Sequence, residues 1–440
     1  RDLTGVNEDV FKDPDLARAY VGYIYRLFQH ADNATSMVQW QNGANGTFND
    51  AYTKTSEELA GQTDWNREWP TIAITQNHAN QYFGQRITAS IANNVWTRMK
   101  QMNIFIEEIE KHGLATEVTN PLKGQMLFWR AWQYFELLKL YGGVPLILLA
   151  QNPIVDEGDK VNEIQRSSSS ATLAQIEKDL DEAISLLPGT WPQAHWGRIN
   201  SGTAAAFKGR VLLTWASPQF NRNDDKARWQ KSYDANLAAK NLLEANGFGL
   251  HPSWDNMWFQ QTDNDEAVIA VVFNSVSADQ TQRNNGWEAA TRSKQTLGGG
   301  SITPTKQMVD AFPMKDGKMP DDASGSYTYD PVKFYKNRDP RFYKTFAYNG
   351  SPWPYGGAPN FRQWTYSWYN NAGATTPNRF TETQGPNSSG IYVRKATSPT
   401  ASNSVGNFGF SPTDYMELRF AEVILNLAES AIGIDNLGAG

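Results

Sequence analysis

The 440-residue sequence contains no cysteine. This absence excludes disulfide bonds, thiolate metal ligands and cysteine nucleophiles, and it means that a cysteine-linked lipid anchor, if there is one, lies outside this chain. Long hydrophobic runs are also absent, since no apolar stretch approaches the ~20 residues that a membrane-spanning helix needs. The start, RDLTGVNEDVF, lacks an apolar signal core and is typical of a mature or trimmed N-terminus. We therefore expect a soluble chain.

Blocks of positive charge are missing as well. The 46 acidic and 40 basic residues give a net charge of -6, so nucleic acid is not an expected partner. The sequence has no HExxH motif, no GxSxG motif and no phosphate-binding loop, and its five histidines show no metal-ligand spacing. We therefore predict that the chain is not an enzyme and has no cofactor.

One acidic loop leaves a metal ion as an alternative. Asp263, Asp265 and Glu266 cluster in a predicted loop. Carboxylate oxygens are ligands that calcium prefers, although the spacing here is not that of an EF-hand loop. A solvated acidic loop is the favoured interpretation, and a structural calcium ion is the alternative to it.

Apolar residues recur at helical spacing in much of the first half and again near the end. The predicted helices cover residues 10–30, 86–112, 121–141, 171–187, 202–217, 228–246 and 418–432. The segment 121–141 is apolar almost all round, which predicts a central buried helix. We expect Asn120 to cap it, Pro121 to occupy its first position and Gly142–Gly143 to end it.

Small residues mark one predicted helix pair. Ala204, Ala205, Ala206 and Gly209 lie on the first helix, and Ala235, Ala238 and Ala239 on the second. Such residues let two helices approach closely, as they do in tetratricopeptide-like units. The predicted fold class is mainly α: tetratricopeptide-like helix pairs form a scaffold that carries a large irregular, loop-rich layer containing short strands.

The irregular segments are rich in aromatic residues. Residues 31–85 and 249–411 combine many Asn, Gly, Ser, Thr and Pro residues with tryptophan and tyrosine, and aromatics make up 12% of the chain. Side chains of this size bury enough area to offset the entropy of ordering a long loop, so we expect an ordered layer. VIAVVFN at 268–274 and SGIYVRK at 389–395 are predicted to be short strands in it.

Five segments, in order along the chain, resemble the SusD/RagB family of starch-utilisation-type outer-membrane lipoproteins. They are QMLFWRAWQYFELLKLYGGVPLI at 125–147, SGTAAAFKGRVLLTWA at 201–216, PTKQMVDAFPMKDG at 304–317, NRDPRFYKTFAYNG at 337–350 and DYMELRFAEVILNLAESA at 414–431. Two features depart from the family pattern: the lipidated N-terminal cysteine is absent, and the chain stops soon after the last signature helix. Residues 31–85 and 351–388 match little, as expected of variable binding loops.

The resemblance implies a cell-surface lipoprotein of the outer membrane that binds a polysaccharide or oligosaccharide without catalysis. It also implies a partner, a SusC-like TonB-dependent transporter over which the protein forms a lid. Contact with the membrane would be made only through an N-terminal lipid that this chain lacks. On this basis we expect a single SusD-like domain over 1–440, with a helical scaffold at 10–248, a loop-rich ligand-binding layer at 249–411 and a C-terminal scaffold helix at 412–440.

Aromatic residues with polar neighbours in the loops are the candidate ligand-binding residues. A tryptophan or tyrosine ring covers the apolar face of a pyranose with little loss of entropy, and Asn, Arg and Asp side chains satisfy its hydroxyls. The candidates are Trp65, Asn66, Arg67, Trp69, Asn285, Trp287, Arg292, Trp353, Tyr355, Trp364 and Trp368. An equally weighted alternative is that each ring pins its loop to the scaffold.

Other conspicuous residues are expected to be structural. Four tryptophans within predicted helices are assigned to the core: Trp129, Trp132, Trp215 and Trp229. Arg338, Asp339 and Arg341 are expected to form a buried ion-pair network.

Two other functions remain open. The RagB branch of the family includes members that serve peptide import, so capture of peptides or another nutrient is the first alternative. A glycosidase is the second, and it needs two carboxylates about 5–10 Å apart. Glu182, Glu417, Glu422 and Glu429 are predicted to lie on helices, where solvated or helix-start positions are the favoured interpretation.

Overall fold

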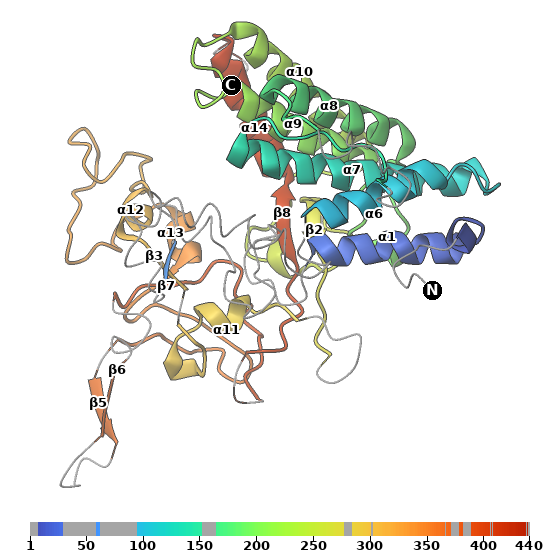
Figure 1. The fold of residues 1–440 in the computed structure, drawn as a ribbon. Helices are drawn as coiled ribbons and strands as arrows, with labels where there is room; N and C mark the ends of the chain where they lie inside the picture. Colours follow the sequence, from blue (N-terminus) through green and yellow to red (C-terminus); the bar gives the residue numbers. More distant parts are fainter. Residues whose placement is uncertain are drawn as a thin grey trace.

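The computed structural model describes residues 8–29, 59–61, 95–151, 164–276, 284–300, 302–365, 367–370, 378–381, 389–404, 406, 408–436 and 438. The long helices gather in one part of the molecule, and the irregular chain with its short strands forms the other part (Figure 1). The strand that precedes the last helix runs from the irregular part toward the helices, and so connects the two.

The predicted helices are present. The long helices are α1 (Pro14–Phe28), α6 (Val95–Glu108), α7 (Thr116–Tyr141), α8 (Ser169–Leu186), α9 (Ser201–Ala216), α10 (Lys226–Ala245) and α14 (Phe420–Gly433). Helix α7 packs against α8, α9 against α10, and α14 against both α9 and α10. None of the helices that the structure describes is long and apolar enough to cross a membrane.

Helix α7 is the centre of the scaffold, as predicted, and 17 of its 26 residues are buried. It begins at Thr116, however, so the prediction that Pro121 holds the first position is wrong. The missing amide of Pro121 leaves the carbonyl of Glu117 without its helical partner. Glu117 is exposed, where water satisfies that carbonyl at little cost. At the other end, Gly142 has φ 70° and ends the helix as expected.

Close packing of α9 on α10 depends on a glycine. A Cβ atom at Gly209 would lie 2.2 Å from the side-chain oxygen of Asn236. Ala204, Ala206 and Ala239 are buried in the same core, as predicted. Ala238 is exposed, so its predicted place in this interface is wrong.

All strands that the structure describes pair in two-stranded antiparallel ladders. The pairs are β1 (Leu59–Gly61) with β3 (Ile302–Pro304), β2 (Ala267–Val271) with β8 (Tyr415–Arg419), β4 (Phe346–Ala347) with β7 (Tyr392–Val393), and β5 (Ser367–Asn370) with β6 (Asn378–Thr381). Strands β2 and β7 confirm the two predicted strands. Strand β8 was not predicted, because its sequence YMELR continues directly into the apolar pattern of α14.

The irregular layer has an aromatic core of its own. Val309, Phe342 and Phe346 are buried together in it, and the rings of Tyr335 and Tyr348 stack with centroids 4.9 Å apart. Short helices α11 (Trp287–Thr291), α12 (Lys306–Asp310) and α13 (Pro340–Thr345) lie in this layer. Aromatic burial therefore substitutes here for the long amphipathic helices of the scaffold.

The predicted network at Arg338, Asp339 and Arg341 takes a different form. Arg338 is buried, but its guanidinium donates to the backbone carbonyls of Phe334, Val309 and Phe312. Asp339 caps α13 and pairs with the exposed Arg341. The prediction of one buried ion-pair network is wrong, because carbonyl oxygens and not carboxylates compensate the buried charge of Arg338.

Candidate functional site

Several predicted site residues lie outside what the structure describes. Trp65, Asn66, Arg67 and Trp69 are outside the described residues altogether. Trp368 belongs to strand β5, for which only the backbone is described. The predictions for these positions stay predictions.

Three other candidates are buried, and for them direct contact with a ligand at the surface is wrong. Trp353 is 1% exposed and donates its indole N–H to the Thr397 hydroxyl at 2.9 Å. Arg292 is 0% exposed, forms an ion pair with Glu288 and donates to the carbonyl of Ser398. Asn285 donates to the Thr413 carbonyl. Each is engaged within the irregular layer itself, whereas the alternative that the sequence left open has the rings pin their loops to the scaffold.

The remaining candidates are accessible but not assembled into one platform. Trp364 is 42% exposed, the largest exposed fraction among the candidates whose side chains the structure describes. Trp287 is half-buried at the start of α11, and its indole N–H donates to the Lys395 carbonyl at 2.8 Å. Tyr355 packs on Phe408, and the buried Arg292 lies against both rings.

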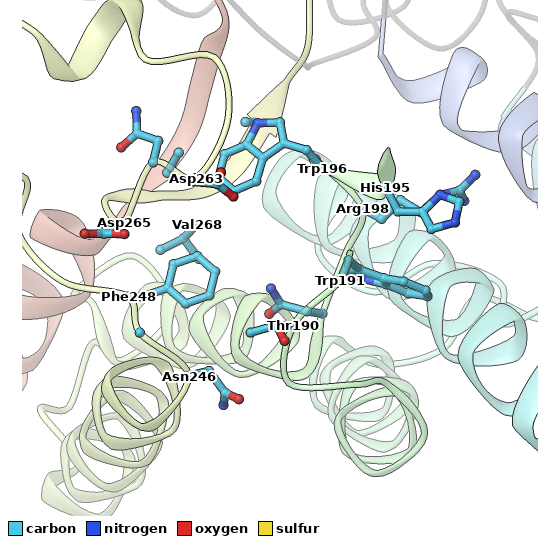
Figure 2. Close-up of a pocket in the computed structure, with 16 residues that line it drawn as sticks. Thr190, Trp191, His195, Trp196, Arg198, Asn246, Phe248, Asp263, Asp265 and Val268 are labelled. Atoms are coloured by element: carbon cyan, nitrogen blue, oxygen red, sulfur yellow. The ribbon is translucent and has the colours of Figure 1, made fainter. Parts of the chain in front are cut away.

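One cavity lies where the scaffold meets the irregular layer (Figure 2). It has a volume of about 270 Å³, and its walls come from the α8–α9 connection and from the segment between α10 and β2. Trp196, Phe248 and Trp191 contribute aromatic rings to it. Polar groups line the same space: Thr190, Asn246, Asp263 and Asp265. Figure 2 shows the Phe248 and Trp196 rings near Asp263 and Val268, whereas the Trp191 ring lies beside His195, away from them.

Local geometry holds these walls in place. The indole N–H of Trp191 donates to the Ile199 carbonyl at 2.9 Å, which closes the turn before α9. Asn246 ends α10 and donates to the Leu242 carbonyl. The Asp265 side chain is exposed. Trp196 differs from Trp191 because its buried indole nitrogen has no hydrogen-bond partner within the described part of the chain.

A second cavity of about 180 Å³ lies in the irregular layer and is lined by both aromatic and basic residues. The rings of Trp254 and Trp258 meet edge to face, with centroids 5.6 Å apart and an interplanar angle of 86°. Lys344 and Arg394 line the same cavity. Because Trp353 also contributes to its wall, that buried residue shapes the cavity from behind.

Four tryptophans of the two cavities were missed from the sequence, although the signal was there: Trp191, Trp196, Trp254 and Trp258. TWPQAHWGR at 190–198 and PSWDNMWFQ at 252–260 place two tryptophans among polar residues. This is the composition that selected WNREW at 65–69. The first of these segments lies inside the predicted scaffold, where tryptophan was assigned to the core.

The acidic loop considered for calcium does not bring its carboxylates together. Glu266 is buried and pairs with Arg419, whereas Asp263 accepts a hydrogen bond from Gln193 at 3.0 Å. Among the residues that the structure describes, no three acidic or histidine side chains form a group that could hold a metal ion.

Two glutamates considered for a glycosidase serve as structural ion pairs. Glu417 lies on strand β8, not on a helix as predicted, and Arg210 of α9 contacts it and Glu422 at 2.8 and 2.7 Å. Burial raises the pKa of Glu417, and the Arg210 guanidinium opposes that rise. Both carboxylates therefore face a partly buried arginine.

Stacked helix pairs that carry an irregular aromatic layer are the architecture of SusD-like proteins, and solved structures bear out that class. A SusD-like protein from Bacteroides fragilis has 21% identity and a TM-score of 0.71, over 99% of this chain and 78% of that one. A SusD-like carbohydrate-binding protein from the same species has 18% identity and a TM-score of 0.71, over 97% and 75%. A laminarin-binding SusD-like protein has 16% identity and a TM-score of 0.59, over 95% and 80%.

Family models match both halves of the chain. Residues 265–438 match the model described as the SusD family. Residues 28–213 match the model described as starch-binding and associating with the outer membrane. The chain therefore belongs to the SusD/RagB family, as its sequence motifs had indicated. A search of curated protein sequences found no significant match.

Proposed function

We propose that this protein is a non-catalytic, cell-surface subunit that captures a polysaccharide or oligosaccharide and delivers it to a SusC-like TonB-dependent transporter. Membership of a carbohydrate-binding family supports the ligand class. The observation that carries the proposal for this chain is the cavity of Figure 2, whose lining combines aromatic rings and hydrogen-bonding groups. A lipid anchor outside this chain would hold the protein at the outer membrane.

The cavity matches the chemistry of a pyranose. An aromatic ring such as Trp196 covers the apolar C–H face of the sugar, and this surface loses little entropy on binding. Asp265, Asn246 and Thr190 supply the acceptors and donors that the hydroxyl groups need. A volume of about 270 Å³ lies near the lower end of small-molecule sites, which begin at about 300 Å³. It therefore suits one sugar unit of a longer chain, with modest affinity for each unit.

The absence of catalysis is part of the proposal. A glycosidase requires one carboxyl group free to donate a proton and a second one free to attack or to activate water. Glu417 and Glu422 are both engaged by Arg210, and Glu182 pairs with Lys123. In the cavity of Figure 2, Asp263 is engaged by Gln193. Release of reducing sugar during incubation with the bound glycan would contradict this part of the proposal.

The test is a binding screen of the purified chain against a panel of polysaccharides, followed by variants measured on the best ligand. We expect Trp196→Ala to weaken binding about ten-fold or more, equivalent to about 1.4 kcal/mol, because the sugar loses the ring that covers its apolar face. Asp265→Ala should weaken binding as well, because a sugar hydroxyl loses its acceptor. Both variants should keep a melting temperature within a few degrees of the parent.

Trp364→Ala removes an exposed indole that lies outside the cavity, at a position that the sequence also predicted for ligand binding. Trp65→Ala and Trp287→Ala test the sites predicted from the sequence. If only these last variants weaken binding, the site lies in the loops and not in the cavity of Figure 2. Failure of every polysaccharide to bind, with binding of peptides instead, would reject the glycan and favour the peptide branch of the family.

A further inference from the structure

The smaller cavity differs from the cavity of Figure 2 in its charge. Lys395 lies 5.2 Å from the Trp258 ring centroid, and the Arg419 guanidinium lies 5.3 Å from the same centroid. The same two cations also lie over Trp254, at 5.7 and 5.4 Å. With Arg394 and Lys344 in the wall, cations surround an edge-to-face tryptophan pair.

The carboxylates nearby compensate only part of this charge. Asp255 pairs with Lys344, and Glu266 pairs with Arg419. In the cavity wall, Lys344 and Arg394 face one carboxylate, Asp255, so the charged groups that line it carry an excess of one positive charge, in a chain whose net charge is -6. A positive cavity on a negative protein is a local feature that the overall composition does not impose.

Arg394 is the cation best placed to meet a ligand. One of its terminal nitrogens donates to the Tyr343 carbonyl at 2.9 Å, and within the described part of the chain no carboxylate lies at ion-pair distance from it. Burial and the nearby Arg292 lower the pKa of Arg394, and the Asp255 carboxylate opposes that fall. A bound anion would compensate the buried positive charge and the repulsion from Arg292, and it would accept two hydrogen bonds from the remaining N–H groups of the guanidinium.

We propose that the Trp254–Trp258 cavity binds the anionic substituent of an acidic glycan, a carboxylate or a sulfate ester, with Arg394 and Lys344 as its charge partners. This inference rests on the proposed function and names the class of glycan. The tryptophan pair contacts the sugar ring, and the cations hold the charged group that the ring carries. A cavity of about 180 Å³ takes the charged substituent and part of the sugar unit that carries it.

Matched polysaccharide pairs test the inference on the full chain. De-esterified polygalacturonate is compared with its methyl-esterified form, and dextran sulfate with dextran, by isothermal titration calorimetry at low salt. We expect at least one acidic form to bind about ten-fold or more tightly than its neutral match, with an affinity that falls as salt rises. A preference confined to the first pair identifies a carboxylate, and one confined to the second identifies a sulfate.

Site variants separate this cavity from general attraction to polyanions. Arg394→Gln and Lys344→Gln should each reduce the acidic preference about five-fold or more, and leave binding of neutral glycans within about two-fold. Lys333→Gln, at an exposed position outside the cavity, should change neither. Binding of neutral and acidic partners with equal affinity, or a preference that survives both cavity variants, would overturn the inference and leave the proposed function standing. Failure of every polysaccharide to bind would remove both.

Discussion

Replacing Arg210 should lower the stability of the junction between the scaffold and strand β8. Its guanidinium makes four contacts: two with the Glu422 carboxylate at 2.7 and 2.8 Å, one with the Glu417 carboxylate at 2.8 Å and one with the Glu417 carbonyl at 2.9 Å. Arg210→Met keeps the aliphatic stem and leaves two carboxylates side by side without their cation. The residue joins α9 to β8 and α14, so the loss acts on the connection between the two parts of the fold.

The magnitude follows from burial. Breaking a buried ion pair costs about 3–5 kcal/mol, and the Glu422 side chain is 33% exposed, so the lower value, about 3 kcal/mol, applies here. An unfolding entropy of roughly 2.1 cal/mol/K per residue over this chain corresponds to roughly 0.9 kcal/mol/K. If the chain unfolds as one unit, the melting temperature should therefore fall by roughly 3 °C at neutral pH.

The pH dependence gives a second test of the same variant. Burial raises the pKa of folded Glu417 above its unfolded value, and Arg210 opposes that rise. Without Arg210, the pKa of Glu417 in the folded state rises further. A raised folded pKa means that protonation stabilises the folded protein. This stabilisation is complete below the unfolded pKa of about 4.3 and is lost as the pH rises through the folded pKa. The deficit of Arg210→Met should therefore shrink as the pH falls from 8 toward 5.

Differential scanning calorimetry across that pH range measures both effects. The double variant Arg210→Met/Glu417→Gln removes the remaining buried charge, so it should recover part of the lost stability and lose most of the pH dependence of the deficit. A melting temperature within 1 °C (about 0.9 kcal/mol) of the parent, or a deficit that stays constant from pH 8 to pH 5, would refute the assignment of this network as a stabilising link.

Two further substitutions probe the scaffold. Arg130→Met should lower the free energy of unfolding by about 4–5 kcal/mol, because Arg130 and Asp179 are almost fully buried and joined by two contacts of 2.7 Å. This loss exceeds the one expected for Arg210→Met. Adding Asp179→Leu should restore most of the melting temperature, and no recovery in the double variant would contradict this. Gly143→Ala should lower the melting temperature or the soluble yield, because the new Cβ would lie 1.8 Å from the Ser167 carbonyl oxygen. Gly249→Ala, which has open space around it, is the control and should behave like the parent.

The scaffold was predictable because its signals are local. The sequence marks α7 and α8 by their apolar spacing, by the serine at position 168 and by the glycine at position 142. In the structure, Ser168 accepts a hydrogen bond from the Ala171 amide, and Gly142 has a positive φ. The start of α7 was misplaced for a local reason too, since a proline is favoured in the first turn but tolerated further along where the freed carbonyl is exposed. Strand β8 escaped prediction because its partner β2 lies far away in sequence.

The binding residues were harder to predict because burial in an irregular layer depends on distant segments. Trp353 and Trp364 lie eleven positions apart in loops of the same composition, yet one is 1% and the other 42% exposed. What buries Trp353 is a strand and a turn about 40 residues later, which contribute Tyr392 and Thr397. No pattern within the loop itself encodes that contact.

The same dependence explains why an aromatic-rich layer suits a protein that must present variable ligand sites. Segments without long helices need large side chains to form a core, so rings of the layer such as Phe342 and Trp353 are buried in its own packing. A ring becomes available to a ligand only where polar or charged neighbours hold the chain open beside it, as Asp265 does near Trp196 and Arg394 near Trp258. The polar neighbours of a tryptophan, and the sign of their charge, therefore carry more information about a binding site than the tryptophan itself.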